Sequence, residues 1–97
     1  MTDAQVDDGA KPDPSPAKGS GAVSVLEYVA SQIVDDPAAV RVESERGAGG
    51  IALRLHVAPD DMGKVIGKRG RVAQSIRTLV RAAGAREGIG VTVDIVD

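Results

Sequence analysis

The residues with the clearest chemical character are the glycines and cations of residues 63–70, which read GKVIGKRG. Three glycines and three basic side chains share these eight positions, and a helically patterned segment, RVAQSIRTLVRAAG, follows at once. Glycine is costly in ordered structure unless the backbone needs an unusual conformation or something must approach it closely. The composition of this segment therefore predicts a loop that receives a negatively charged group.

Residues suited to catalysis are few in this chain. The adjacent acids at 35–36 and 60–61 are expected at the ends of elements, where capping and turn roles account for them. Ser75 falls inside an expected helix with no partner to activate it, and His56, the single histidine, is expected at an exposed or edge position of a strand. Because the chain also lacks cysteine, we expect no enzyme activity, no metal, no cofactor and no small-molecule substrate.

The known nucleotide-binding loops do not fit the glycine spacing. The G-x-x-x-x-G-K-[ST] loop needs one more residue between its glycines and a hydroxyl after the lysine, whereas Arg69 follows Lys68. The G-x-G-x-x-G fingerprint would need a glycine where Val65 stands. What remains is G-x-x-G at residues 67–70, between two expected helices. Its exposed N–H groups and basic tip predict a site for a run of phosphates, with a plain helix-to-helix turn as the alternative.

Charge is distributed unevenly along the chain. The net charge is -2, and residues 1–21 account for it with four Asp and two Lys, so that residues 22–97 are neutral. Residues 62–86 contain no acid and seven bases, a local excess that attracts polyanions whatever the net charge. The alternative is a solvated helix face. The seven bases are Lys64, Lys68, Arg69, Arg71, Arg77, Arg81 and Arg86.

The pattern of apolar residues predicts an acidic, Pro-rich disordered tail over residues 1–21 and an α+β domain over residues 22–97. The tail holds three of the five prolines and almost no bulky apolar side chain, so it cannot offset its ordering entropy. In the domain, the order is helix, strand, strand, helix, helix, strand. One apolar face per element predicts a three-stranded sheet with three helices on one side. Asp60 is expected as a helix N-cap and Gly84 as a helix stop.

Two further absences bear on function. With Tyr28 as the only aromatic residue, the chain has no platform of the kind on which some RNA-binding sheets and barrels stack bases. No run of apolar residues is long enough for a membrane span or a signal peptide, so a cytoplasmic protein without a membrane partner is expected.

Residues 65–76, VIGKRGRVAQSI, resemble the I-G-K-x-G-x-x-[IV]-x-x-[IL] signature of KH domains, whose G-x-x-G loop holds about four nucleotides of single-stranded RNA or DNA. The element order α-β-β-α-α-β is similar to the bacterial, type II arrangement. Further segments, LEYVA at 26–30 and VTVDIV at 91–96 among them, are similar to small bacterial proteins with one KH domain. The resemblance covers residues 23–97, whereas the tail is longer than those proteins usually have.

The resemblance implies a partner and a cellular role. Such proteins are cytoplasmic binders of single-stranded RNA, described as RNA chaperones or post-transcriptional regulators. They form homodimers and associate with a larger KH-containing protein, and in some bacteria they are linked to cell elongation and cell-wall synthesis. The alternative is a scaffold or dimerisation module, in which RNA binding is secondary.

The resemblance also implies which residues contact the nucleic acid. The loop contacts the sugar–phosphate backbone, with basic residues beside it, and aliphatic side chains form a groove or, equally, part of the core. Two polar residues of the following helix are placed to bond bases, although solvent exposure also explains them. The implied site consists of Gly67, Lys68, Arg69, Gly70, Arg71, Lys64, Ile66, Val72, Gln74 and Ser75.

Four other residues have a weaker connection to this site. Ile76 is expected either in the groove or in the core. Arg77 and Arg81 lie one turn apart and are expected on a solvated helix face, with steering of RNA as the alternative. Arg54 is placed to reach bound RNA from its strand.

Overall fold

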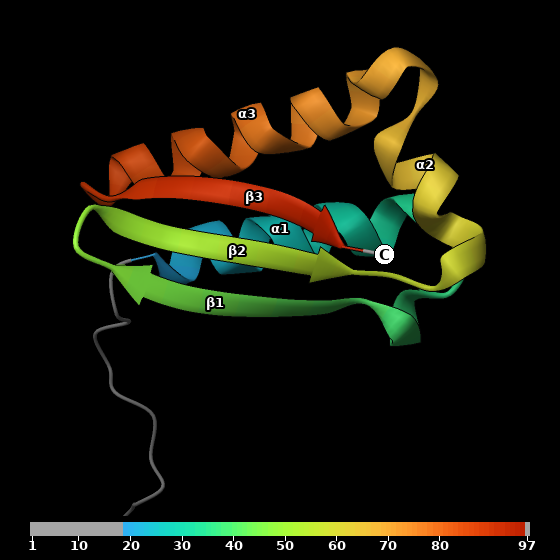
Figure 1. The fold of residues 1–97 in the computed structure, drawn as a ribbon, viewed down its shortest axis with the longest axis horizontal. Coiled ribbons are helices and arrows are strands. Elements are labelled where there is room, and N and C mark those ends of the chain that lie inside the picture. The colour runs from blue at the N-terminus through green and yellow to red at the C-terminus, as the bar shows by residue number, and fades with distance from the viewer. Residues whose placement is uncertain (1–18, 97) are drawn as a thin grey trace, which may run out of the picture.

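The computed structural model describes residues 19–96, so most of the predicted tail (residues 1–21) lies outside the described residues. Figure 1 shows the fold. The described part contains three α-helices, three strands and three short 3-10 helices. The elements are α1 (Ser20–Ile33), η1 (Pro37–Ala39), β1 (Arg41–Gly47), β2 (Gly50–His56), η2 (Pro59–Asp61), α2 (Met62–Ile66), η3 (Lys68–Gly70), α3 (Arg71–Arg86) and β3 (Gly90–Val96).

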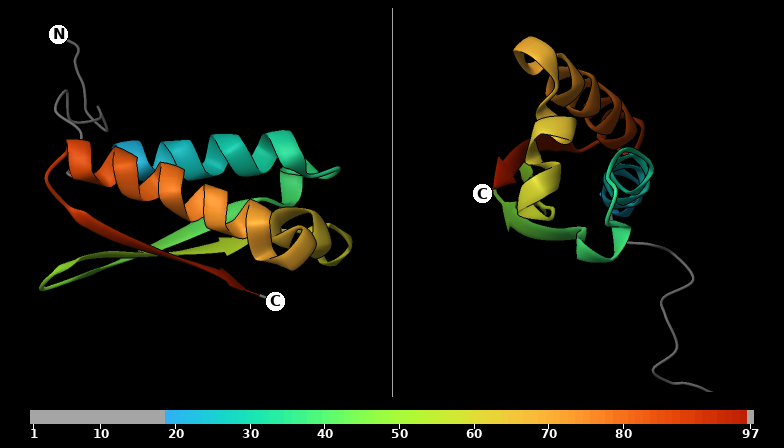
Figure 2. Two further views of the ribbon diagram at one scale, coloured as in Figure 1. Left: turned by 90° about the horizontal axis from the view of Figure 1, so that it is seen from above. Right: turned by 90° about the vertical axis from the view of Figure 1, so that its right-hand side faces the viewer.

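The strands form one mixed sheet in the order β1-β2-β3. β1 pairs with β2 in the antiparallel sense and β2 pairs with β3 in the parallel sense, with Leu53 opposite both Ser44 and Val93. The helices lie on one face of this sheet, as the end-on view in Figure 2 shows. The predicted α+β, type II KH arrangement is thereby confirmed.

The core lies between the sheet and helices α1 and α3. Alternate residues of β2 and β3 point toward the helices and are buried, which is the period expected of strands with one covered face. The apolar stripes of α1 and α3 meet them at helical spacing. The buried apolar residues of these four elements are Ala22, Leu26, Ala30, Ile51, Leu53, Leu55, Ala73, Ile76, Val80, Val91 and Val93.

Gly84 does not end its helix, contrary to the expectation from sequence. α3 continues to Arg86, and Gly84 is buried in its last turns. A Cβ at this position would lie 2.4 Å from a methyl carbon of Val91, so the glycine permits the close approach of α3 to β3. Gly88, with φ of 74°, is the glycine that turns the chain after the helix.

The predicted N-cap role of Asp60 is also wrong. Asp60 lies in η2 and is exposed, whereas its neighbour Asp61 is 2% exposed. The Asp61 carboxylate accepts hydrogen bonds from the backbone N–H groups of Asp35 (3.2 Å) and Asp36 (3.1 Å). Asp61 therefore ties the segment after α1 to the start of α2.

The first turn of α1 is capped by a side chain that is distant in the sequence but adjacent in space. The backbone N–H groups of Gly19 and Gly21 donate to the carboxylate of Glu87, at 2.5 Å and 3.3 Å. A carboxylate suits this position because the first N–H groups of a helix lack partners within it and carry partial positive charge. The contact fixes the point where residues 1–18 join the fold, beside the C-terminal end of α3.

Candidate nucleic-acid interface

The G-x-x-G loop has a backbone conformation that its glycines make possible. Gly67 has φ of 75° and ψ of 177°, and Gly70 has φ of 72°. A Cβ on Gly67 would lie 2.3 Å from a methyl carbon of Val72, so only glycine fits between α2 and the start of α3. Between them, Arg69 adopts a left-handed conformation, with φ of 57°. Half-buried Val72 thus contacts the base of the loop.

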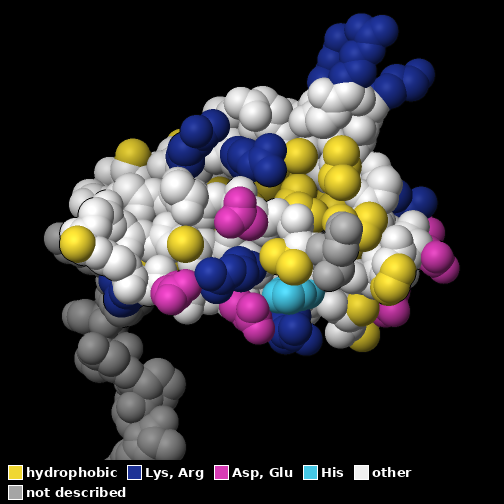
Figure 3. All heavy atoms as spheres, viewed as in Figure 1, with side chains coloured by type: hydrophobic (Ala, Val, Ile, Leu, Met, Phe, Trp, Pro, Cys, Tyr) yellow, Lys and Arg dark blue, Asp and Glu magenta, His cyan; other side chains and the backbone are white. Residues whose placement is uncertain are grey.

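The loop presents cations without counter-charges. Lys68, Arg69 and Arg71 are exposed, and no residue of the described part forms an ion pair or a hydrogen bond with their side chains. Figure 3 shows basic side chains projecting from the molecule at the junction of α2 and α3. This arrangement produces a positive tip that is open to an anion from solvent.

Lys64, predicted beside the loop, lies on α2 and has a partner. Its Nζ atom is 3.4 Å from a carboxylate oxygen of Asp35, and both side chains are largely exposed. An exposed pair of this kind contributes little to stability, about 0–1 kcal/mol. Lys64 therefore remains able to exchange Asp35 for another anion.

The aliphatic candidates differ in their exposure to solvent. Ile66 is 39% exposed at the end of α2, immediately before the loop, whereas Ile76 is 1% exposed and belongs to the core. Figure 3 shows hydrophobic side chains gathered between the basic tip and the C-terminal ends of β2 and β3. The loop thus stands beside an apolar surface.

The two polar candidates of α3 are on its outer surface. Gln74 and Ser75 are both exposed and line a shallow hollow together with Arg71, Thr78 and Leu79, all from the same helix. Arg71 is the first residue of α3, so the hollow begins directly after the loop. Ser75 points away from β3, because residues two apart on a helix face different sides and Arg77 contacts β3.

Arg77 is not on a solvated face, and that expectation is wrong. Its side chain is half-buried, and its Nε donates a 3.1 Å hydrogen bond to the carbonyl oxygen of Val93. β3 is an edge strand, so a side chain from α3 can reach its backbone from the open side. Arg81 is exposed and lies along the same seam between α3 and β3. The spacing of the two arginines did not indicate this difference between them.

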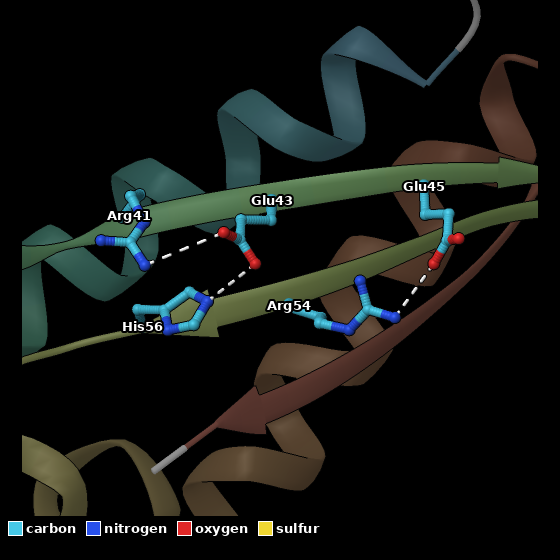
Figure 4. Close-up of polar contacts among 5 residues, drawn as sticks. All are labelled: Arg41, Glu43, Glu45, Arg54 and His56. Carbon is cyan, nitrogen blue, oxygen red and sulfur yellow. Dashed lines mark hydrogen bonds and ion pairs between the residues drawn. The ribbon is translucent and has the colours of Figure 1, made fainter.

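The open face of the sheet carries a group of charged side chains that the sequence analysis did not identify as a unit (Figure 4). Glu43 lies between Arg41, at 3.8 Å, and the His56 ring, at 3.0 Å. Arg54 donates to Glu45 at 3.0 Å, so it is paired on the sheet rather than directed at the loop. The register of β1 on β2 brings these side chains together, because residues directly opposite each other, such as Glu43 and Arg54, lie on the same face of the sheet.

The hydrogen bond from His56, followed by the positive charge of that ring and of Arg41 and Arg54, holds the pKa of Glu43 below its ordinary value of 4.5. We expect the Glu43 carboxyl to titrate below that value by NMR, and its midpoint to rise in the His56→Ala variant. A lowered folded-state pKa means that the stabilising contribution exists above the unfolded pKa and is lost as pH falls through the folded one. An unchanged midpoint in the variant would contradict the assignment to His56.

Residues 19–96 contain neither a membrane-spanning helix nor a cluster of metal ligands. None of the described helices has both the length and the apolar character needed to cross a membrane. Within the same residues, His, Asp and Glu form no group of three that suits a metal ion.

The mixed three-stranded sheet, its three helices on one face and the G-x-x-G loop between two of them define a KH domain. A model of the KhpA/KhpB KH-domain family matches residues 23–95. The chain belongs to this family. Its similarity to curated proteins extends over most of their length as well as its own.

The relatives are proteins named "RNA-binding protein KhpA". That of Caldanaerobacter subterraneus is 50% identical over 72 residues, which cover 74% of this chain and 96% of the relative. That of Streptomyces coelicolor is 49% identical over 72 residues, covering 74% and 87%. That of Mycobacterium tuberculosis is 45% identical over 75 residues, covering 77% and 90%.

Among solved structures, the fold is similar to part of Aquifex aeolicus Era bound to GDP.AlF4-. The TM-score is 0.60 and the sequence identity 16%, with 95% of this chain and 35% of Era covered. At that identity the likeness concerns the fold alone.

Proposed function

We propose that this protein binds single-stranded RNA through the loop at residues 67–70, without catalysing a reaction. The observation that carries the proposal is the loop itself, in which Gly67 and Gly70 have positive φ and Lys68 and Arg69 have no described counter-charge. The first N–H groups of α3 follow directly and favour phosphate oxygens. The printed names of the relatives support RNA as the polyanion.

The composition of the interface favours weak sequence preference. The bases would rest on aliphatic side chains such as Ile66, because no aromatic platform adjoins the loop in the sequence. Gln74 is the polar residue of α3 better suited to bond a base, since it is three residues from Arg77, which contacts β3, whereas Ser75 is two residues away and faces another side. Lys64 and Arg71 would flank the bound strand.

The proposed cellular role is that of an RNA chaperone or post-transcriptional regulator in the cytoplasm. This part of the proposal is supported by family membership, and a connection with cell elongation and cell-wall synthesis is proposed on the same ground. Holding short single-stranded segments with little base preference is the property that such a role requires.

Salt dependence tests the phosphate contacts directly. If three or four phosphates are bound, the logarithm of the affinity for a short uridine oligonucleotide should fall against the logarithm of salt concentration with a slope of about -2 to -3. Fluorescence anisotropy at several salt concentrations measures this slope. A slope near zero would show that RNA, if bound, is not held by its phosphates.

A second proposed property is self-association and binding to the larger KhpB. The observation that favours it is the exposure of two large apolar side chains on the helical layer, Tyr28 at 67% and Leu79 at 51%. Exposed residues of this kind are common singly, but both lie away from the loop's tip on α1 and α3. In the alternative form of the proposal, this scaffold function is primary and RNA binding secondary.

A further inference from the structure

The two cations of the loop lack a described partner, unlike several other cations of the domain. Lys64 lies near Asp35, Arg54 donates to Glu45, and Arg77 donates to a β3 carbonyl. Lys68 and Arg69, by contrast, are exposed, and within residues 19–96 no side chain or carbonyl pairs with theirs. An acidic segment of the same chain would find open cations there.

The N-terminal sequence supplies such a segment. Residues 3–8 contain Asp3, Asp7 and Asp8 and no basic residue. Residues 9–18 contain Asp13 with two lysines, so the negative charge is concentrated at the distal end. The distribution of charge is complementary to that of the loop, since residues 62–86 contain bases and no acids.

The attachment point places this segment within reach of the loop. Gly19 is held by Glu87 beside the C-terminal end of α3, and the loop lies at the N-terminal end of the same helix. The 16 residues of α3 span about 24 Å. The 11 residues from Asp8 to Gly19 can extend over about 36 Å. Asp8 can therefore reach Lys68 and Arg69 without any change in the fold.

We propose that residues 3–8 bind the Lys68–Arg69 loop within the same molecule and compete there with RNA. Attachment through a short linker keeps the acidic segment at an effective concentration in the millimolar range, enough for a weak contact to be populated. RNA of higher charge density displaces it. The contact itself does not depend on the function proposed above, whereas the competition rests on it.

Paramagnetic NMR tests the contact without RNA. The chain has no cysteine, so Ala10→Cys gives one labelling site for a nitroxide. At an ionic strength of about 0.01 M, where the Debye length is about 30 Å, we expect broadening of the amide signals of residues 68–71. The broadening should vanish at about 1 M salt and in the D3N/D7N/D8N variant.

The amides of Ala38 and Ala39 in η1 provide the internal control. Figure 1 shows η1 at the same end of the sheet as α2, and its sequence neighbours are the acids Asp35 and Asp36. These signals should stay sharp. Equal broadening of η1 and of the loop, or loop broadening that survives the three Asp→Asn changes, would overturn the proposal.

RNA affinity tests the competition. At low salt, D3N/D7N/D8N should bind a uridine oligonucleotide about two- to fivefold more tightly than the unaltered chain. The matched variant E27Q/D36N/D60N makes the same change in net charge at exposed positions of the domain and should gain less. Equal gains would overturn the competition. If the unaltered chain binds no RNA, the proposed function fails, and the NMR experiment still decides whether the contact exists.

Discussion

Replacing both Lys68 and Arg69 with Asp should abolish RNA binding and leave the domain folded. The change converts two exposed positive charges to two negative ones at the point where phosphates would lie, so we expect a loss of at least about a hundredfold in affinity. Folding should survive because no described residue pairs with either side chain. Asp is also suited to position 69, where φ is 57°, because it tolerates the left-handed region better than most residues.

Gel shift measures binding in this experiment, and circular dichroism measures folding. The matched control is R81D/R86D, which makes the same charge change at exposed positions toward the other end of α3 and should weaken binding less. Unimpaired binding by K68D/R69D would refute the loop assignment. Sedimentation of the same variant after RNase treatment separates the two proposed functions, because self-association that persists cannot depend on RNA held at the loop.

Replacing Asp61 with Ala should produce the largest loss of stability among single changes to the acids of the domain. The carboxylate is buried and accepts two backbone N–H groups, from Asp35 and Asp36. Hydrogen bonds to a charged group contribute about 1.5–3 kcal/mol, and the N–H groups would be left without an acceptor. We expect the free energy of unfolding to fall by about 2–4 kcal/mol.

Urea unfolding followed by circular dichroism measures this loss. Asp60→Ala is the control, since the neighbouring side chain is exposed and its removal should change the unfolding free energy by no more than about 0.5 kcal/mol. Asp61→Asn should fall between the two, because it keeps one acceptor oxygen. Indistinguishable midpoints for the two alanine variants would contradict the structural role of Asp61.

The sequence predicted those features that depend on neighbours along the chain. Strand β2 was predicted because Ile51, Leu53 and Leu55 alternate with polar or small residues, and sheets with one covered face require that period. The turn at residues 67–70 was predicted for the same kind of reason, since the need for glycine arises from local dihedral angles.

Features that depend on distant partners could not be predicted in this way. Asp61 bonds residues that are 25 and 26 positions away, and Glu87 bonds residues 66 and 68 positions away. The local pattern predicted Asp60 as a helix cap, but it is the neighbouring Asp61 whose carboxylate accepts hydrogen bonds from a distant segment. Gly84 was misassigned because a glycine required for close packing has the same local appearance as one that ends a helix.

Asp61 also has a consequence for the thermodynamics of ligand binding. α2 has only five residues and would not be stable as an isolated helix. It is held at its start by Asp61 and at its end by the contact of Gly67 with Val72. The G-x-x-G loop is therefore preorganised, because its conformational entropy is lost when the domain folds and not when the ligand binds. Loosening Asp61 should weaken binding at a loop that it never touches.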